Sequence, residues 1–534
     1  MPYTVQDDAR YATVLSGVNK SDEDVFVGWT CDTTRDGKAI DVGVGTLVGT
    51  YGGALDYGYN RLKGSYVKVG IGLVYFEQYA DGSTGYYGYL SETQTAFDTL
   101  NDSLAIDSWG YRLIVPFVEG DKSKPVVAKG TWFEKSLTEQ GTLTIYDRAF
   151  RSFSFNTGAS MKTSTKTITY AFGGKTATYS FNLNFARAVA HENGEVRAAT
   201  AVDGNGKAQP AWSVRHALQF PGALAPNGSD SSVQEQYMGD AFLQERDIDM
   251  RAAPQSTYDY QFIRPFRGLY DGGSHAIRGY FARLSIEKDH RLGLFPYVNG
   301  GTLKNIEMKE DGSHTIAWTN SIDAAFGCLA GVVVNGTIDR CTLTSDSVAS
   351  ISITGLNPTG GNTTHNTGHN IGGLVGNAWN TRIVHSSIEN FSISVSSADG
   401  TWKTNEVHMG MLVGRVDATG LASVKDSLTA LSAANSSLTV TACAAAHQTE
   451  SIGGIAGLML VSGEQTIEGW TANKLDLIVT ADHPRDLLYA GGLVGEARGP
   501  VVVGSTNSCS AIVLQAEGAK EPLDAKMIGK SDEA

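Results

Sequence analysis

The chain has 534 residues, of which 41% are apolar, 9% aromatic and 18% charged. This length exceeds one ordinary hydrophobic core, so we expect two or three domains, and the apolar content excludes wholesale disorder. The excess of 56 Asp and Glu over 42 Lys and Arg leaves a net charge of −14, which argues against general binding to nucleic acid.

We expect that the first twenty residues are not a secretory leader, because Asp7, Asp8 and Arg10 lie where a leader needs an apolar segment. Two explanations stay open. Either the protein is never exported, or Met1 replaces a leader and the chain is a piece of a longer protein that also carries an anchor. The repeats described below favour the second explanation, which predicts a cell-surface or secreted location. No run of about 18 apolar residues occurs, so we expect no membrane span.

Residues 1–110 are predicted to form a β domain rich in tyrosine and glycine. Nine of the 22 tyrosines fall within residues 51–89, among valine-containing runs that suit a half-buried sheet. Packing within the sheet is one interpretation of this cluster. The other is a binding surface, because tyrosine combines a rigid apolar face with a polar tip. Tyr86, Tyr87 and Tyr89 lie in a glycine-rich stretch and are the best candidates for ligand binding.

Residues 111–205 are predicted to form a second β domain, either a sandwich or a single antiparallel sheet. Two strand-like runs, 166–172 and 176–185, flank Gly173 and Gly174, and this pattern predicts a tight hairpin. The polar residues 192–209 predict a linker, and residues 212–220 have the spacing of a short amphipathic helix.

From residue 206 to residue 518 the chain repeats itself. A short apolar segment that closes on glycine recurs five times, and the closing glycines, 38 to 45 residues apart, are Gly331, Gly376, Gly414, Gly457 and Gly495. Each copy is followed by short β-branched runs, which predict strands. Because one such repeat cannot bury its inner face alone, the pattern predicts a parallel β-solenoid. The glycines are expected where the backbone turns tightly or approaches its neighbour closely. Residues 519–534 are predicted to be a C-terminal tail or linker.

One segment carries a more specific pattern. Residues 266–279 are FRGLYDGGSHAIRG, and residues 300–306 are GGTLKNI. With the preceding Asp-Ile-Asp at 247–249, they resemble the GLUG-repeat region of bacterial surface proteins. Pro296 stands where that family has glycine, which argues against a tight backbone approach there. The resemblance covers about residues 208–518 and implies a right-handed solenoid, in keeping with the usual hand of crossover connections. Such repeats occur in adhesins and in non-catalytic regions of large secreted peptidases.

No catalytic motif is found in the sequence. His191 and Glu192 begin a zinc-peptidase motif, but Glu195 stands where its second histidine is required, and no G-x-S-x-G occurs. Glycan cleavage would need two carboxylates in one cleft, and the sequence does not place candidate pairs such as Asp339 and Asp346 together.

We also expect no metal ion and no cofactor. His365 and His369 lie in a loop rich in Asn, Thr and Gly, where a solvated turn is expected rather than a metal site. The aspartates within residues 32–41 lack the spacing of a calcium loop. The five cysteines are few and widely spaced, so we expect small buried hydrophobes rather than disulfides.

Together these patterns predict a non-catalytic, adhesin-like bacterial protein with a stiff solenoid scaffold. Its N-terminal module would bind a host glycan or surface protein. Trp379 and Trp402, beside solenoid corners, are the second pair of candidate ligand-binding residues, because exposed loops often carry function. Two alternatives remain. One is a glycan-cleaving β-helix enzyme or a tail-spike-like protein, and the other is the non-catalytic part of a larger surface peptidase.

Overall fold

The computed structural model of the protein describes the chain in segments. The described residues are 13–14, 24–31, 40–42, 47–48, 62–68, 72–88, 97–98, 100–101, 103–104, 106–115, 126–127, 140–143, 153–156, 164–172, 175–183, 199–202, 206–215, 220–221, 238–252, 265–281, 286–287, 291–318, 324–354, 368–396, 401–402, 406–441, 443–444, 449–479, 488–516, 519–524 and 526–531. Before residue 199, the side chains described are those of residues 77–85, 100, 101, 103 and 104. The tyrosine-rich stretch is therefore described mainly by its backbone.

The chain divides into two compact units, Met1–Arg197 and Ala198–Ala534. Their described residues are nearly all β, and the short helical turns among them include η4 (Met250–Ala252) and α2 (Val424–Ser427). The predicted all-β class is confirmed. In the part of the chain that the structure describes, no helix is long and apolar enough to cross a membrane.

The described strands of the first unit pair in antiparallel fashion. One sheet has five described strands in the order β10 (Val126–Val127), β9 (Ile106–Val115), β6 (Gly72–Tyr79), β7 (Thr84–Gly88) and β8 (Phe97–Asp98). A second sheet has four, in the order β11 (Gln140–Leu143), β12 (Phe153–Asn156), β13 (Ser164–Phe172) and β14 (Lys175–Leu183). A third has the order β3 (Ile40–Val42), β2 (Asp24–Cys31) and β5 (Leu62–Lys68), and β1 (Thr13–Val14) pairs separately with β4 (Leu47–Val48). The hairpin predicted around Gly173 and Gly174 is confirmed, because β13 and β14 pair as far as Phe172 opposite Lys175.

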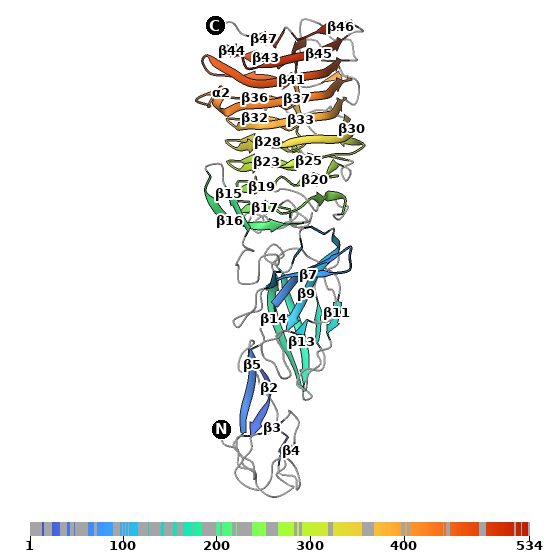
Figure 1. The fold of residues 1–534 in the computed structure, drawn as a ribbon, viewed down its shortest axis with the longest axis vertical. Helices are drawn as coiled ribbons and strands as arrows, with labels where there is room; N and C mark the ends of the chain where they lie inside the picture. Colours follow the sequence, from blue (N-terminus) through green and yellow to red (C-terminus); the bar gives the residue numbers. More distant parts are fainter. Residues whose placement is uncertain are drawn as a thin grey trace. The chain divides into compact units, whose positions relative to one another are not determined.

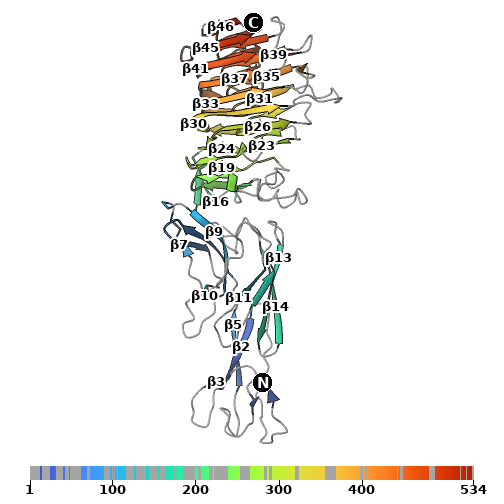
Figure 2. The ribbon, with the colours of Figure 1, turned by 90° about the vertical axis from the view of Figure 1, so that its right-hand side faces the viewer.

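The second unit stacks parallel strands in three sheets, and Figures 1 and 2 show the strands lying one above another as the colour passes from green to red. Among the described residues, the seven-stranded sheet contains β23 (Phe295–Asn299), β28 (Ala330–Val334), β32 (Val375–Trp379), β36 (Val413–Asp417), β40 (Ala456–Leu460), β43 (Val494–Arg498) and β47 (Ile528–Ser531). The six-stranded sheet contains β22 (Arg291–Leu292), β27 (Ala325–Phe326), β31 (His369–Gly372), β35 (Glu406–Gly410), β39 (Thr449–Gly453) and β42 (Leu488–Gly491). Each pass from β22 and β23 to β42 and β43 thus places one strand in each of these two sheets.

The third and largest sheet has 18 described strands. They are β15 (Ala199–Val202), β16 (Ala208–Val214), β17 (Ala241–Gln244), β18 (Ile248–Asp249), β19 (Leu269–Asp271), β20 (Ala276–Arg278), β21 (Ile286–Glu287), β24 (Thr302–Lys304), β25 (Glu307–Lys309), β26 (Ser313–Trp318), β29 (Thr337–Asp339), β30 (Thr342–Thr354), β33 (Arg382–Val395), β37 (Leu428–Val440), β41 (Gln465–Val479), β44 (Val501–Val503), β45 (Ser508–Ala516) and β46 (Ala519–Pro522). The pairs β15–β16 and β45–β46 are antiparallel. A separate parallel pair joins β34 (Thr401–Trp402) to β38 (Cys443–Ala444).

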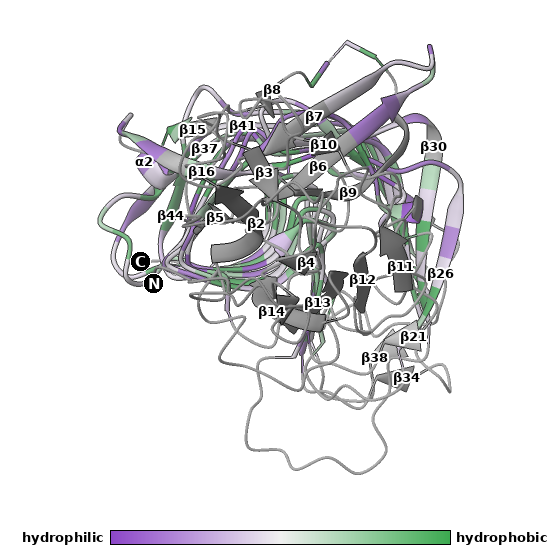
Figure 3. Ribbon diagram, turned by 90° about the horizontal axis from the view of Figure 1, so that it is seen from below, coloured by the Kyte–Doolittle hydropathy of each residue, from purple (hydrophilic) through white to green (hydrophobic). Residues whose placement is uncertain are grey.

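The register between passes pairs apolar residues with apolar residues and serines with serines. Ile351, Ile393 and Leu438 pair in consecutive long strands, and each is buried. The residue before each of the last two is a serine, and the Ser437 hydroxyl donates a hydrogen bond to the Ser392 hydroxyl at 2.8 Å. Figure 3 shows apolar and polar residues alternating along β26 and β30. A slip of one residue would place this serine face in the core, so the alternation fixes the register.

The repeated glycines form a ladder of close backbone contacts. A Cβ atom added to Gly376 would lie 2.6 Å from the Gly331 carbonyl oxygen, and one on Gly495 would lie 2.7 Å from that of Gly457. Both distances are too short for a side chain, so the predicted close approach is confirmed. The ladder also reaches Pro296, because a Cβ atom on Gly331 would lie 2.8 Å from the Pro296 carbonyl oxygen. This contact requires glycine at position 331 and not at position 296, so the expectation that Pro296 itself is not closely approached stays a prediction.

Single residues with left-handed backbone bend the chain at corners of the stack. In one such column, consecutive passes carry Asn305, Arg340, His385, Ala430 and Gly469, with φ angles of 51°, 53°, 51°, 53° and 71°. The strand residues before them pair directly across the passes. Asparagine and glycine tolerate this conformation, whereas alanine is strained by it.

The residues of the resembled motif lie in the lowest passes. Phe266, Tyr270 and Ile277 are fully buried. A Cβ atom on Gly268 or Gly272 would overlap the backbone of a neighbouring pass. The motif therefore specifies core packing and backbone proximity here.

Strands occupy three stretches for which the sequence predicted other structure. β15 and β16 lie within the predicted linker 192–209 and the predicted helix 212–220, and β16 pairs in parallel with β17. β47 lies in the predicted tail and pairs in parallel with β43. In all three, pairing with the exposed edge of a stacked sheet supplies hydrogen bonds that local sequence patterns do not reveal.

Candidate functional site

Four of the five predicted ligand-binding residues lie in described strands, and these strands belong to three sheets. Tyr86 and Tyr87 belong to β7 and pair with Phe76 and Tyr75. Trp402 ends β34. The side chains of these three residues, and Tyr89 as a whole, lie outside the described residues.

Two described side chains test the predictions for aromatic residues. Tyr79 belongs to the tyrosine cluster and is buried, as the packing interpretation predicts for it. Its hydroxyl donates a hydrogen bond to the Glu77 carboxylate at 3.0 Å. Trp379, at the end of β32, is 40% exposed. Of the predicted binding residues, Trp379 is therefore the one whose exposed side chain the structure describes.

The indole ring of Trp379 is held in place by its neighbour in the next pass. Its Nε1–H donates a hydrogen bond to the Asp417 carboxylate. The other oxygen of Asp417 accepts hydrogen bonds from the Thr419 backbone N–H at 3.2 Å and from the Thr419 hydroxyl at 2.6 Å. The guanidinium of Arg415 lies 3.9 Å from the same carboxylate. Both oxygens of the Asp417 carboxylate thus accept hydrogen bonds, and the indole N–H has an acceptor.

Two asparagines lie next to Trp379 along the backbone, and the Asn335 N–H donates a hydrogen bond to the Trp379 carbonyl oxygen at 2.8 Å. Asn335 and Asn380 follow the paired residues Val334 and Trp379, and both have left-handed backbone, with φ of 51° and 45°. The side-chain oxygen of Asn380 accepts a hydrogen bond from the Gly420 N–H at 2.8 Å. We call Asn335, Trp379, Asn380, Asp417 and Thr419 the Trp379 corner. It combines a partly exposed aromatic ring with amide and hydroxyl groups.

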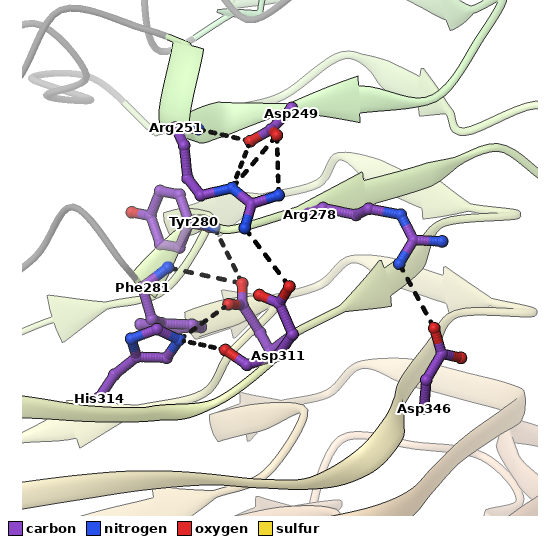
Figure 4. A network of polar contacts seen from close by, with 9 residues as sticks. Asp249, Arg251, Arg278, Tyr280, Phe281, Asp311, His314 and Asp346 are labelled. Atoms are coloured by element: carbon purple, nitrogen blue, oxygen red, sulfur yellow. Dashed lines mark hydrogen bonds and ion pairs between the residues drawn. The ribbon is translucent and has the colours of Figure 1, made fainter.

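A second polar cluster lies in the lower passes (Figure 4). The Arg251 guanidinium donates three hydrogen bonds to Asp249, from Nε to Oδ1 at 2.9 Å and to Oδ2 at 3.1 Å and from Nη2 to Oδ2 at 2.8 Å, and its Nη1 lies 3.3 Å from Oδ2 of Asp311. The hydrogen bond from Arg251 holds the pKa of Asp249 below its usual value. These three side chains are substantially exposed, so the pairs contribute little to stability.

Glu310 lies beneath this cluster and is fully buried. Its Oε1 accepts hydrogen bonds from the backbone N–H of Tyr280 at 2.9 Å and of Phe281 at 3.5 Å. Its Oε2 lies 3.6 Å from Nε2 of His314. Burial outweighs these contacts and raises the pKa of Glu310 to about 7. A carboxyl group with that pKa can act as an acid or base, but this one does not reach solvent, so a substrate cannot contact it in this structure.

A third network joins the six-stranded and seven-stranded sheets. Arg498 Nη2 lies 2.7 Å from Glu406 Oε1, and Arg498 Nε lies 3.1 Å from Glu496 Oε1. Glu496 also accepts a hydrogen bond from the buried Ser451 hydroxyl at 2.9 Å. The hydrogen bonds from His408 and then Arg498 lower the pKa of Glu406 to about 2. Because its charges are paired and partly buried, this network suits a structural link between sheets.

His369 corrects the expectation of a solvated turn. The residue lies in β31 and is fully buried, and its Nδ1 accepts a hydrogen bond from the Ala324 N–H at 3.2 Å. Burial lowers the pKa of His369 to about 4, so the ring is neutral. His365 lies outside the described residues. Among the residues that the structure describes, no group of three or more His, Cys, Asp or Glu side chains could hold a metal ion.

The cysteines whose side chains are described are free thiols. Cys328 and Cys341 are buried and Cys509 is partly buried. Burial raises the pKa of Cys341 to about 12. The predicted role as small buried hydrophobes is confirmed for the first two.

Comparison with known proteins gives distant structural likenesses only. No family model matches the chain, and no curated protein matches it. A presumed immunoglobulin A1 protease from Bacteroides ovatus, known from a crystal structure, is 17% identical with a TM-score of 0.36, over 62% of this chain and 86% of that one. A second structure, an IgA1 protease, is 14% identical with a TM-score of 0.30, over 86% of this chain and 28% of that one. At these TM-scores neither likeness supports an inference about activity.

The sequence patterns missed Glu310, Glu406 and Arg498. Each depends on a partner from another pass, and the spacing between passes varies from copy to copy. An alignment of the repeats by their closing glycines would place Glu496 and Arg498 beside the glycine ladder. It would not pair Arg498 with Glu406, which lies two passes earlier.

Proposed function

We propose that this chain is a non-catalytic, adhesin-like part of a secreted or cell-surface protein. In this proposal residues 206–518 form a right-handed parallel β-solenoid of the GLUG type, which acts as a stiff stalk. The N-terminal module presents Tyr86, Tyr87 and Tyr89 to a host glycan or surface protein. The alternative, a non-catalytic part of a larger surface peptidase, would use the same stalk for a different neighbouring domain.

The observation that supports the stalk is the unbroken register of the seven-stranded sheet. From β23 to β47 each described strand pairs in parallel with the strand of the next pass. The six-stranded sheet and the long strands of the largest sheet repeat this pairing. A stack in which each pass is hydrogen-bonded to the next in three sheets resists bending, which suits a spacer.

Side-chain and backbone contacts that hold neighbouring passes together also support a stalk. The link from Arg498 to Glu406 spans two passes, and the glycine ladder brings backbones together through the stack. These residues would keep the passes from separating under load. A glycan-cleaving enzyme would instead need an accessible acid and base, and the described group closest to that chemistry, Glu310, is buried.

Adhesion of the full chain tests the proposal. Beads coated with the folded protein are incubated with epithelial cells, with heat-unfolded protein as the control, and the supernatant is assayed for released sugars and peptides. Binding by folded protein without released product supports a non-catalytic adhesin. Release of sugars or peptides would refute it, and so would equal binding by folded and unfolded protein.

A further inference from the structure

Trp379 stands out among the exposed apolar residues of the described chain. The large apolar side chains exposed there are Val202 at 38%, Trp379 at 40% and Val502 at 44%, and Trp379 is the aromatic one. Exposing an indole ring forfeits hydrophobic stabilisation. A reason for its exposure is therefore needed.

The fold itself does not require an aromatic residue at this position. The paired positions in the neighbouring passes are Asn299, Val334, Asp417, Leu460 and Arg498. Polar, aliphatic and charged side chains all serve at the end of these strands. Trp379 is the aromatic member of the column, and its ring is fixed rather than loose, because Asp417 binds its N–H.

The surroundings of the ring select the chemistry of its partner. With Nε1 bound to Asp417, the ring offers chiefly carbon surface to solvent. Asn335 follows Val334, which pairs with Trp379 from one adjacent pass, and Thr419 lies two residues after Asp417, which pairs with Trp379 from the other; both are exposed. A Cβ atom added to Gly420 would lie 2.5 Å from the amide nitrogen of Asn380. An apolar face framed by amides and hydroxyls matches a sugar ring, which has C–H groups on one face and hydroxyls at its edge.

The charge of the corner narrows the ligand class further. The Asp417 carboxylate is matched by the N–H of Trp379, by Thr419 and by the Arg415 guanidinium at 3.9 Å. The corner therefore presents no uncompensated charge to attract an acidic or basic ligand. A protein partner would favour a wider apolar patch than one ring.

We propose that the Trp379 corner binds a neutral oligosaccharide, with one sugar ring stacked on the indole. Asn335, Asn380 and Thr419 would then hydrogen-bond the hydroxyls of that sugar or the next one. This inference deepens the proposed adhesin-like function by naming a ligand class and a site on the stalk, but its geometry is independent of the N-terminal module.

The test uses the full chain and an array of neutral oligosaccharides, followed by titration of the strongest wild-type binder. Trp379→Ala should weaken binding about tenfold or more, because the stacking surface is removed. Trp379→Phe should retain part of the affinity, since it keeps a ring but loses the bond to Asp417. Val502→Ala, which alters a similarly exposed apolar side chain on β44, is the matched control and should bind as the wild type does.

The outcomes separate this inference from the proposed function. Loss of binding in Trp379→Ala with an unchanged melting temperature supports the inference. Wild-type affinity in Trp379→Ala overturns it, and so does an array on which no neutral glycan binds. If Tyr86→Ala with Tyr87→Ala abolishes glycan binding while Trp379→Ala does not, the corner is excluded and the adhesin proposal stands. If the corner binds glycan but coated beads do not adhere to cells, the adhesin proposal fails alone.

Discussion

Arg498 and Glu406 are separated by 92 residues along the chain, yet their side chains form an ion pair with a nitrogen–oxygen distance of 2.7 Å. The pair lies at the boundary of two sheets, with about a quarter to a third of each side chain exposed. Glu406 also accepts a hydrogen bond from buried His408, and loss of the arginine would remove the cationic partner of a partly desolvated carboxylate.

We therefore expect Arg498→Met to lower the free energy of unfolding by about 1.5–3 kcal/mol, the range for hydrogen bonds to charged groups. Urea unfolding at pH 7 measures this change. Arg340→Met is the matched control, because Arg340 pairs with Asp339 at 2.8 Å while its own side chain is 61% exposed. Its loss should be below about 1 kcal/mol. Equal losses in the two variants would show that burial of the Arg498 network does not matter.

Glu310 should make the protein less stable as the pH rises. Its pKa is raised from 4.5 to about 7 in the folded chain, so the folded state binds the proton more tightly than the unfolded state. The resulting stabilisation is fully present below about pH 4.5 and is lost as the pH rises through about 7. Between pH 5 and pH 8 this loss should be about 3 kcal/mol at most in the wild type. Glu310→Gln keeps a neutral side chain at all pH values and should abolish the loss.

The measurement for Glu310 is urea unfolding at pH 5 and at pH 8 for the wild type and the variant. Glu389→Gln, which removes an exposed carboxylate on β33, is the control and should follow the wild-type pH dependence. Parallel pH profiles for wild type and Glu310→Gln would contradict the assignment of the loss to Glu310.

The glycine ladder should not tolerate side chains. Gly376→Val and Gly495→Val would each place atoms against the backbone of the preceding pass, which is held by hydrogen bonds in its own sheet. We expect a loss of about 1–3 kcal/mol or more per substitution, as for overpacked cores. Gly239→Ala is the control, because nothing lies within 4 Å of its added Cβ atom. Melting curves that coincide for all three variants and the wild type would refute the ladder.

Ala430 offers a stabilising substitution. Its φ of 53° is a left-handed conformation that costs an L-residue about 1–2 kcal/mol, and the next pass has Gly469 at the paired position. Ala430→Gly should raise the free energy of unfolding by about 0.5–1 kcal/mol, after the added entropy cost of glycine. Ala434→Gly, in the same strand but without positive φ, should instead destabilise. A loss of stability in both variants would mean that the bend is not strained.

The sequence by itself determined the stacking of the second unit. The glycines at 38–45 residue spacing and the alternation of apolar with Ser or Thr residues are local patterns, and each has one physical reading. Glycine is needed where backbones touch, and alternation is needed where one face is buried. The β13–β14 hairpin was predictable for the same reason, because a two-residue Gly-Gly turn joins runs of period two.

Only the tertiary structure decided which residues meet across the passes. The strands β15, β16 and β47 form because the edge of a sheet is available for pairing, and no local sequence pattern indicates that edge. The burial of His369, the raised pKa of Glu310 and the pairing of Arg498 with Glu406 depend on register between passes of unequal length. The exposure of Trp379 was likewise decided by contacts between passes. A tryptophan at the end of a strand packs or projects according to what the next pass places beside it, and here that residue is Asp417, a hydrogen-bond acceptor that holds the indole at the surface.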